Sequence, residues 1–108
     1  MSNGLGELEQ LVLLAILRRD GDAYGIAVQQ EIARHSDRAL TLGAVYSTLA
    51  RLEEKGLITS YEGAPTPTRG GRRKKLYKVQ AAGRSALRDA LSALRALSRG
   101  LSPLLDRP

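Results

Sequence analysis

Residues 41–61, TLGAVYSTLARLEEKGLITSY, constrain the fold more than any other stretch of the chain. Projected at about 100° per residue, residues 42–54 form a helix with one apolar side and one side of small or polar residues. The apolar side consists of Leu42, Val45, Leu49 and Leu52. Thr41 is the predicted N-terminal cap, and Gly56 is the glycine predicted to end the helix. The β-rich run LITSY follows at once, so a helix that packs on a core leads directly into a strand.

Two more helices are predicted before this one. Residues 5–19, LGELEQLVLLAILRR, carry apolar side chains around nearly the whole circumference of a helix, so this helix belongs inside a core. After the turn RDGD, Asp22 is the predicted N-cap of a second helix. In that helix Tyr24, Val28 and Ile32 repeat every four residues, and it extends to about His35.

The chain after Gly56 predicts a β-hairpin and one last helix. LITSY and KLYKV are runs of strand length, and the segment EGAPTPTRGGRRK between them contains prolines and paired glycines that interrupt regular structure. The last helix is predicted from near Ala81 to about Arg99, ahead of Gly100 and Pro103.

The order helix, helix, helix, hairpin, helix is that of a winged helix, a variant of the helix-turn-helix motif. The predicted fold class is therefore mainly α with a small β-hairpin. A winged helix-turn-helix DNA-binding domain is expected over residues 5–80, and a C-terminal dimerisation helix over residues 81–101. A chain of 108 residues has room for one modest core, which fits this arrangement.

Basic residues are concentrated in the C-terminal part of the chain, and this distribution favours a polyanionic partner. The net charge is +6; residues 1–68 hold six Lys and Arg against nine Asp and Glu, whereas residues 69–108 hold eleven against two. Six of the eleven lie between Arg69 and Lys78, with no acid among them. Taken alone, this run has an alternative explanation as a loop kept soluble by its charge.

The third predicted helix and the hairpin are where such a partner would bind. In a winged helix the third helix enters the DNA major groove and the hairpin lies along the backbone. Small residues would let that helix approach DNA closely, and its polar groups can donate to phosphates or base edges. The residues expected at DNA are Thr41, Gly43, Ala44, Ser47, Thr48 and Arg51 on the helix, and Arg69, Arg72, Arg73, Lys74 and Lys75 in the hairpin. The alternative for Gly43 and Ala44 is tight helix packing within the domain.

Leucines on the last predicted helix indicate a second copy of the chain as a partner. Leu87, Leu94 and Leu101 are spaced by seven residues, and a chain this small has no further element to cover that stripe. The apolar first helix would share the interface. The residues expected in the dimer are Leu8, Leu11, Leu87, Leu91, Leu94, Leu97 and Leu101. Arginines beside the stripe leave an anionic membrane surface as the alternative partner.

Other kinds of site find little support in the sequence. The chain has no cysteine, and its one histidine, His35, is better explained with Glu31 and Asp37 as a solvated helix end than as a metal site. We therefore expect no catalytic residue, no cofactor and no metal. The apolar run 11–17 is too short to span a membrane and the N-terminus lacks the basic region of a signal peptide, so a cytoplasmic protein is expected.

Four segments together resemble the PadR-type transcriptional regulators, from Leu5 to about Leu97. They are LGELEQLVLLAIL, AYGIAVQQEI, LGAVYSTLARLEEKGLI and LYKVQAAG. The resemblance implies a dimeric winged-helix repressor of the short subfamily, whose single C-terminal helix packs against the partner's N-terminal and C-terminal helices. It also implies that Tyr46 contacts a phosphate and that the hairpin tip contacts DNA.

The chain departs from the PadR pattern at two points. Residues 77–83, YKVQAAG, lack the threonine that commonly caps the last helix, so a weaker helix start is expected. The absence of Trp and Phe argues against an aromatic drug site at the dimer interface.

Taken together, the sequence predicts a DNA-binding regulator that is not an enzyme and that acts as a homodimeric repressor on a palindromic operator. Its expected partners are double-stranded DNA and a second copy, with no membrane, and a small-molecule effector of unknown identity is left open. The alternative is a winged-helix module that binds RNA or a protein partner.

Overall fold

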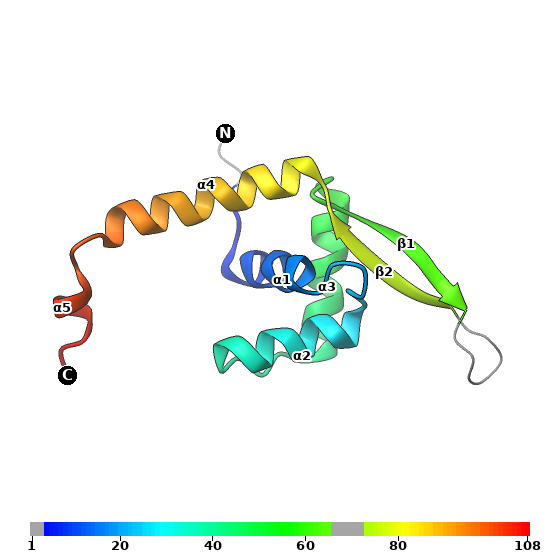
Figure 1. Cartoon of the computed structure of the whole chain (residues 1–108), viewed down its shortest axis with the longest axis horizontal. Helices are drawn as coiled ribbons and strands as arrows, with labels where there is room; N and C mark the ends of the chain where they lie inside the picture. The colour runs from blue at the N-terminus through cyan, green and yellow to red at the C-terminus, as the bar shows by residue number, and fades with distance from the viewer. Residues whose placement is uncertain (1–3, 66–72) are drawn as a thin grey trace.

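The computed structural model describes residues 4–65 and 73–108, and Figure 1 shows their helices and hairpin in chain order. The helices are α1 (Glu7–Arg18), α2 (Gly25–Ser36), α3 (Leu42–Glu54), α4 (Ala81–Ser98) and α5 (Ser102–Leu105), and the strands are β1 (Ile58–Pro65) and β2 (Arg73–Val79). The expected fold class, mainly α with a small antiparallel hairpin, is confirmed. The short helix α5 is not predicted by the sequence; Pro103 lies in its first turn, where the missing N–H of proline is tolerated.

α1 lies at the centre of the core, as its apolar circumference predicts. It packs against α2, α3, α4 and β2, and its residues Val12, Leu13 and Ile16 are buried. The other elements surround it with mainly branched side chains, which are Val28, Ile32, Val45, Leu49, Leu52, Ile58, Val79 and Leu87. α1 is therefore the support on which α3 and the hairpin are mounted. No helix among the described residues is long and apolar enough to cross a membrane.

The predicted helix boundaries are right at α3 and wrong at the start of α2. Thr41 caps α3, because its Oγ1 accepts a hydrogen bond from the backbone N–H of Ala44 at 3.0 Å. Gly56 follows α3 with a φ of +75°, the left-handed conformation that glycine adopts freely. Asp22 does not cap α2, because that helix begins only at residue 25. The Asp22 carboxylate instead accepts a hydrogen bond from Arg19 Nη2 at 2.8 Å and closes the turn between α1 and α2.

The hairpin is fixed to the body at its root and extends away from it at its far end (Figure 1). β1 and β2 pair in antiparallel register, with Ile58 opposite Val79 at the root. The backbone N–H of Tyr77 donates to the carbonyl of Ala23 at 2.9 Å, which ties β2 to the turn before α2. Both strands extend beyond the predicted runs LITSY and KLYKV, so the segment between them is shorter than expected.

α4 has a covered half and an uncovered half. Leu87 is 4% exposed and Leu91 packs against the core, whereas Leu94 and Leu97 are 57% and 80% exposed. In Figure 1 the C-terminal half of α4 leads away from the body. The expectation that Leu87 lies in a dimer interface is therefore wrong, because its side chain is covered within its own chain, where α4 packs on α1 and β2.

Candidate nucleic-acid interface

The outer side of α3 is exposed and is built largely from small residues. Gly43, Ser47 and Ala50 are exposed and Ala44 is half-buried. Tyr46 stands among them with 47% of its surface exposed. The first turn of α3 contains no acidic residue. The first turn of this side can therefore approach a polyanion closely without charge repulsion.

Thr48 does not belong to this side of α3, and its expected place at DNA is wrong. It is 1% exposed, and its hydroxyl donates to the carbonyl of Ala44 at 2.8 Å. Its position, three residues after Val45 and four before Leu52, is at the edge of the apolar side of the helix, and the fold buries it there. The hydroxyl satisfies its hydrogen bond within the helix and is unavailable to DNA.

Glu9 of α1 lies against the C-terminal end of α3. It is 5% exposed, and its Oε2 accepts a hydrogen bond from Lys55 Nζ at 2.6 Å. Arg51 Nε lies 3.7 Å from the same oxygen, while half of the Arg51 side chain stays exposed. The other carboxylate oxygen, Oε1, accepts from the backbone N–H of Gly6 at 2.9 Å. Glu9 thus forms a close ion pair with Lys55 and a longer one with Arg51.

The charge of Glu9 is stabilised by these contacts. Burial acts to raise the pKa of Glu9, but the hydrogen bonds from Lys55 and Gly6 and the positive charges of Lys55 and Arg51 outweigh it, so the pKa lies below its ordinary value of 4.5. Glu9 is therefore ionised at neutral pH. Glu9 is not among the residues predicted for the site, although an acid three residues before Val12, on the buried side of a largely apolar helix, is a detectable signal.

The described part of the hairpin carries exposed lysines. Lys74 and Lys75 are both exposed, and Lys74 Nζ lies 4.1 Å from the centroid of the Tyr24 ring, a cation–π contact. Arg73 is the first residue of β2. Arg69 and Arg72 lie outside the described residues. The basic character expected of the hairpin is therefore present on β2.

The start of α2 brings α3 and the hairpin together. Lys74 of β2 lies on the ring of Tyr24. Tyr46 of α3 lies on the next residue, Gly25, so closely that a Cβ there would be 2.4 Å from the Tyr46 hydroxyl oxygen. The first turn of α2 contains no acidic residue. The exposed side of α3 and the basic strand of the hairpin thus meet at one surface, through two residues that the sequence analysis had not assigned to it.

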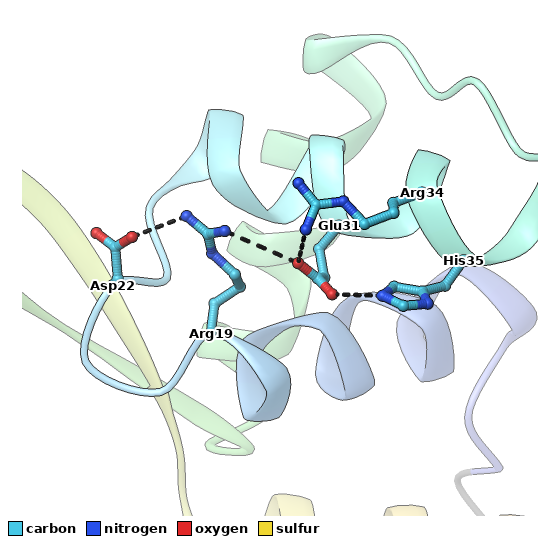
Figure 2. Close-up of polar contacts among 5 residues, drawn as sticks. All are labelled: Arg19, Asp22, Glu31, Arg34 and His35. Atoms are coloured by element: carbon cyan, nitrogen blue, oxygen red, sulfur yellow. Dashed lines mark hydrogen bonds and ion pairs between the residues drawn. The ribbon is translucent and has the colours of Figure 1, made fainter.

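His35 takes part in an ion-pair cluster between α1 and α2 (Figure 2). The buried carboxylate of Glu31 lies 2.9 Å from His35 Nε2 and within 4.0 Å of guanidinium nitrogens of Arg19 and Arg34. Arg19 also pairs with Asp22. Within residues 4–65 and 73–108, no group of three or more His, Cys, Asp or Glu side chains could hold a metal ion. The cluster instead fastens α2 to the end of α1.

Comparison with known proteins points to one family. The sequence profile described as Transcriptional regulator PadR-like family matches residues 13–89. A transcriptional regulator of Mycobacterium tuberculosis is 36% identical over 80 residues, which cover 74% of this chain and 70% of that relative. A PadR family transcription regulator from Clostridium difficile R20291 has a solved structure with a TM-score of 0.75, 25% identity, and coverage of 93% of this chain and 99% of that one. A PadR-like transcriptional regulator from Bacillus cereus gives a TM-score of 0.74 at 22% identity, covering 94% of this chain and 93% of its own.

The matched residues 13–89 include the second half of α1, all of α2 and α3, the hairpin and the first half of α4. These are the elements that place α3 and β2 at one surface. PadR regulators are DNA-binding proteins without enzymatic activity, which confirms the expectations of DNA binding and of no catalysis. This chain therefore belongs to the PadR-like family and is a winged-helix DNA-binding regulator of transcription.

Proposed function

We propose that this regulator is a repressor that binds a palindromic operator as a homodimer, with α3 in the major groove and the hairpin on the adjoining backbone. The observation that carries the proposal is the meeting of α3 and β2 at the start of α2, where Tyr46 lies on Gly25 and Lys74 lies on Tyr24. A dimer bound over a promoter would exclude other proteins from that DNA, and this exclusion is the proposed means of repression.

The proposed residues of α3 have three roles: they let the helix approach DNA closely, they contact phosphates, or they read a base. The residues are Thr41, Gly43, Ala44, Tyr46, Ser47 and Arg51. Arg51 is the candidate for reading a base, because its side chain is half exposed and its ion pair with Glu9 involves only Nε. Tyr46 is suited to a phosphate, since its side chain is half exposed, carries a hydroxyl donor and lies beside the first turn of α2, which contains no acidic residue.

The hairpin is proposed to supply sequence-independent affinity. Its contacts are Arg69, Arg72, Arg73, Lys74 and Lys75. Lysine and arginine that neutralise phosphates release condensed counterions, so this part of the binding weakens as salt rises. Phosphate contacts also fix the register of α3 in the groove without reading sequence themselves.

The second copy is proposed to cover the free half of α4. Leu94, Leu97 and Leu101 are exposed there, and a groove beside them, between α1 and α4, has a leucine floor with arginines at its rim. The groove is lined by Leu14, Leu17, Leu87, Leu91, Ser92, Arg84, Arg88 and Arg95. Pairing about a two-fold axis would cover both surfaces and place two α3 helices about 34 Å apart, in successive major grooves. The proposed interface comprises Leu8, Leu11, Leu91, Leu94, Leu97 and Leu101.

This proposal divides the chain by task. Residues 5–80 bind DNA, and residues 81–101 join the two copies together with Leu8 and Leu11 of α1. The mechanism needs no cofactor, because shape, hydrogen bonding and charge account for every step. We place the activity in the cytoplasm, where the promoter DNA is.

The proposal is tested by fluorescence anisotropy with three labelled nucleic acids. These are a duplex from the region upstream of the gene, a scrambled duplex of equal length, and an RNA duplex. The upstream duplex should bind about a thousandfold or more tightly than the scrambled one, as is typical of specific regulators. Equal affinity for both DNA duplexes would contradict sequence-specific binding. Preference for the RNA duplex would instead support an RNA-binding winged helix.

A further inference from the structure

Gly25, the first residue of α2, has no room for a side chain. A Cβ built on its backbone would lie 2.4 Å from Cζ and from Oη of Tyr46, and 2.6 Å from Cε1. Carbon atoms in favourable contact lie about 3.5–4.0 Å apart. A methyl group at residue 25 and the ring of Tyr46 therefore cannot occupy their positions together. The Tyr46 ring fills the space that a side chain at residue 25 would take.

The obstruction at Gly25 differs in kind from that at Gly83 on α4. At Gly83 a Cβ would lie 2.2 Å from the backbone oxygen of Leu57, which cannot move without shifting the chain. At Gly25 the obstructing atoms are the far end of one side chain, and Tyr46 is 47% exposed. A side chain with an open side can rotate away. A substitution at Gly25 is therefore expected to move Tyr46 and to leave the fold in place.

We propose that Gly25 is a positioning residue, which holds the Tyr46 ring against the start of α2 in the orientation that DNA binding requires. The inference rests on the proposed function, in which Tyr46 contacts a DNA phosphate. A tyrosine that is free on a surface samples several rotamers and loses that freedom on binding, whereas a ring already seated on a glycine has lost it beforehand. Gly25 thus increases DNA affinity without contacting DNA.

The contact of Tyr46 with Gly25 can be disrupted without disrupting the contact of the hairpin with the neighbouring residue, Tyr24. Tyr24 carries Lys74 of β2 on its ring, with Nζ 4.1 Å from the ring centroid, while Gly25 carries Tyr46 of α3. Tyr24 is therefore contacted by β2, and the adjacent Gly25 is contacted by α3. Displacement of Tyr46 removes one contribution to DNA binding and leaves the cation–π pair at Tyr24 intact.

A double-mutant cycle in DNA binding tests the proposal. Wild type, Gly25→Ala, Tyr46→Ala and the double variant are titrated against a random-sequence DNA duplex at fixed salt, because a phosphate contact affects all sequences alike. Tyr46→Ala should bind about a hundredfold more weakly, because the proposed dimer loses one hydrogen bond to a charged group from each copy. Gly25→Ala should lose nearly the same factor, and the double variant should bind no more weakly than Tyr46→Ala. Wild-type affinity in Gly25→Ala, or losses that multiply in the double variant, would overturn the proposal.

A matched control and a stability measurement separate positioning from folding. Gly6→Ala adds the same methyl group at the start of α1, where the nearest atom, Glu9 Oε1, would be 3.7 Å away, so its DNA affinity should equal that of wild type. Thermal unfolding is recorded for every variant. Where Gly25→Ala lowers stability, adding Tyr46→Ala should restore it, since the obstructing ring is gone. A loss of stability that persists in the double variant would contradict the proposal.

The seating of the ring can also be measured without DNA. The chain has four tyrosines, so ring-labelled tyrosine gives few NMR signals, and those of Tyr46 are the ones lost in Tyr46→Ala. Gly25→Ala should shift the Tyr46 ring signals and leave those of Tyr61 in place. Unshifted Tyr46 signals would overturn the proposal. Shifted signals together with full DNA binding by Tyr46→Ala would support the seating on Gly25 and would contradict the phosphate contact assigned to Tyr46.

Discussion

One stripe of leucines runs along both halves of α4, but the surroundings of the two halves are opposite. Leu87 in the first half is 4% exposed, whereas Leu97 in the second half is 80% exposed. The first half packs on α1 and β2, and the second half leaves the body (Figure 1). An apolar stripe in a sequence thus predicts that a surface is covered, but it does not tell which chain covers it. We assign the first half of α4 to the fold and the second half to a partner copy.

The largest expected effect comes from Leu94→Glu in the uncovered half. An unpaired charge buried at an interface costs about 3–5 kcal/mol, and a two-fold axis would introduce two of them. The wild-type protein should be a dimer by light scattering and the variant a monomer, and the far-UV circular dichroism of the two should be the same.

A conservative variant provides the control for this substitution. Leu94→Met keeps an apolar side chain of similar volume and should remain a dimer. A dimeric mass for Leu94→Glu would contradict the assignment of the uncovered half of α4 to a partner copy, because that half would then have no part in the association.

In the covered half of α4, Leu87→Ala is expected to lower the stability of the fold. Removing a buried leucine side chain typically lowers the free energy of unfolding by about 2–5 kcal/mol, and this loss should appear in denaturant unfolding at a protein concentration low enough to keep the chain monomeric. Leu97→Ala, at the exposed position, should change the same quantity by less than about 0.5 kcal/mol. Equal losses at the two positions would show that the halves do not differ within one chain.

Substitutions in the hairpin should separate DNA binding from association. Replacing Arg72, Arg73, Lys74 and Lys75 by alanine removes four proposed phosphate contacts from each copy and therefore eight from the dimer. Each contact is worth about 0.9 in the slope of log K against log salt, so the slope should flatten by about 7.2. The mass of the free protein should not change. Arg107→Ala, near the C-terminus, is the control and should leave the slope as in wild type. An unchanged slope in the variant with all four substitutions would show that the hairpin does not contact DNA.

The sequence was sufficient where a local rule decides the outcome. Thr41 and Gly56 were placed correctly because capping and a left-handed end depend on a few neighbouring residues. The prediction of Asp22 as the N-cap of α2 was wrong, because α2 begins at Gly25 and the Asp22 carboxylate accepts a hydrogen bond from Arg19. Leu87 was misassigned because its burial depends on where α4 crosses α1, which spacing alone does not specify.

The candidate site was predicted less completely than the fold. The small outer side of α3 follows from helical projection, but Thr48 lies at the edge of the apolar side, where projection alone did not exclude it. The roles of Glu9, Tyr24 and Gly25 arise from contacts between elements far apart in the chain. No local pattern encodes those contacts.

The smallest expected effect concerns Glu9, which belongs to the body and not to the free half of α4. Glu9→Gln should lower the free energy of unfolding at neutral pH by about 1.5–3 kcal/mol, the range for hydrogen bonds to a charged group. Because the folded pKa of Glu9 lies below its ordinary value of 4.5, its contribution is complete above about pH 4.5 and is lost as the pH falls through the folded value.

The difference in stability between wild type and Glu9→Gln should therefore shrink in acid. Glu7→Gln, at an exposed position on the same helix, should show a difference near zero at neutral pH. A wild-type advantage that grows as the pH is lowered would contradict the assigned pKa direction, and a change in dimer mass would contradict the assignment of Glu9 to the body.

Hydroxyl-radical footprinting of the protein on the region upstream of its gene tests the central claim most directly. A homodimer with one α3 in each of two successive major grooves should protect two stretches centred about 10 base pairs apart, on one face of the duplex and related by an inverted repeat. Protection of a single stretch, or protection that follows no sequence, would contradict a repressor that binds a palindromic operator as a dimer.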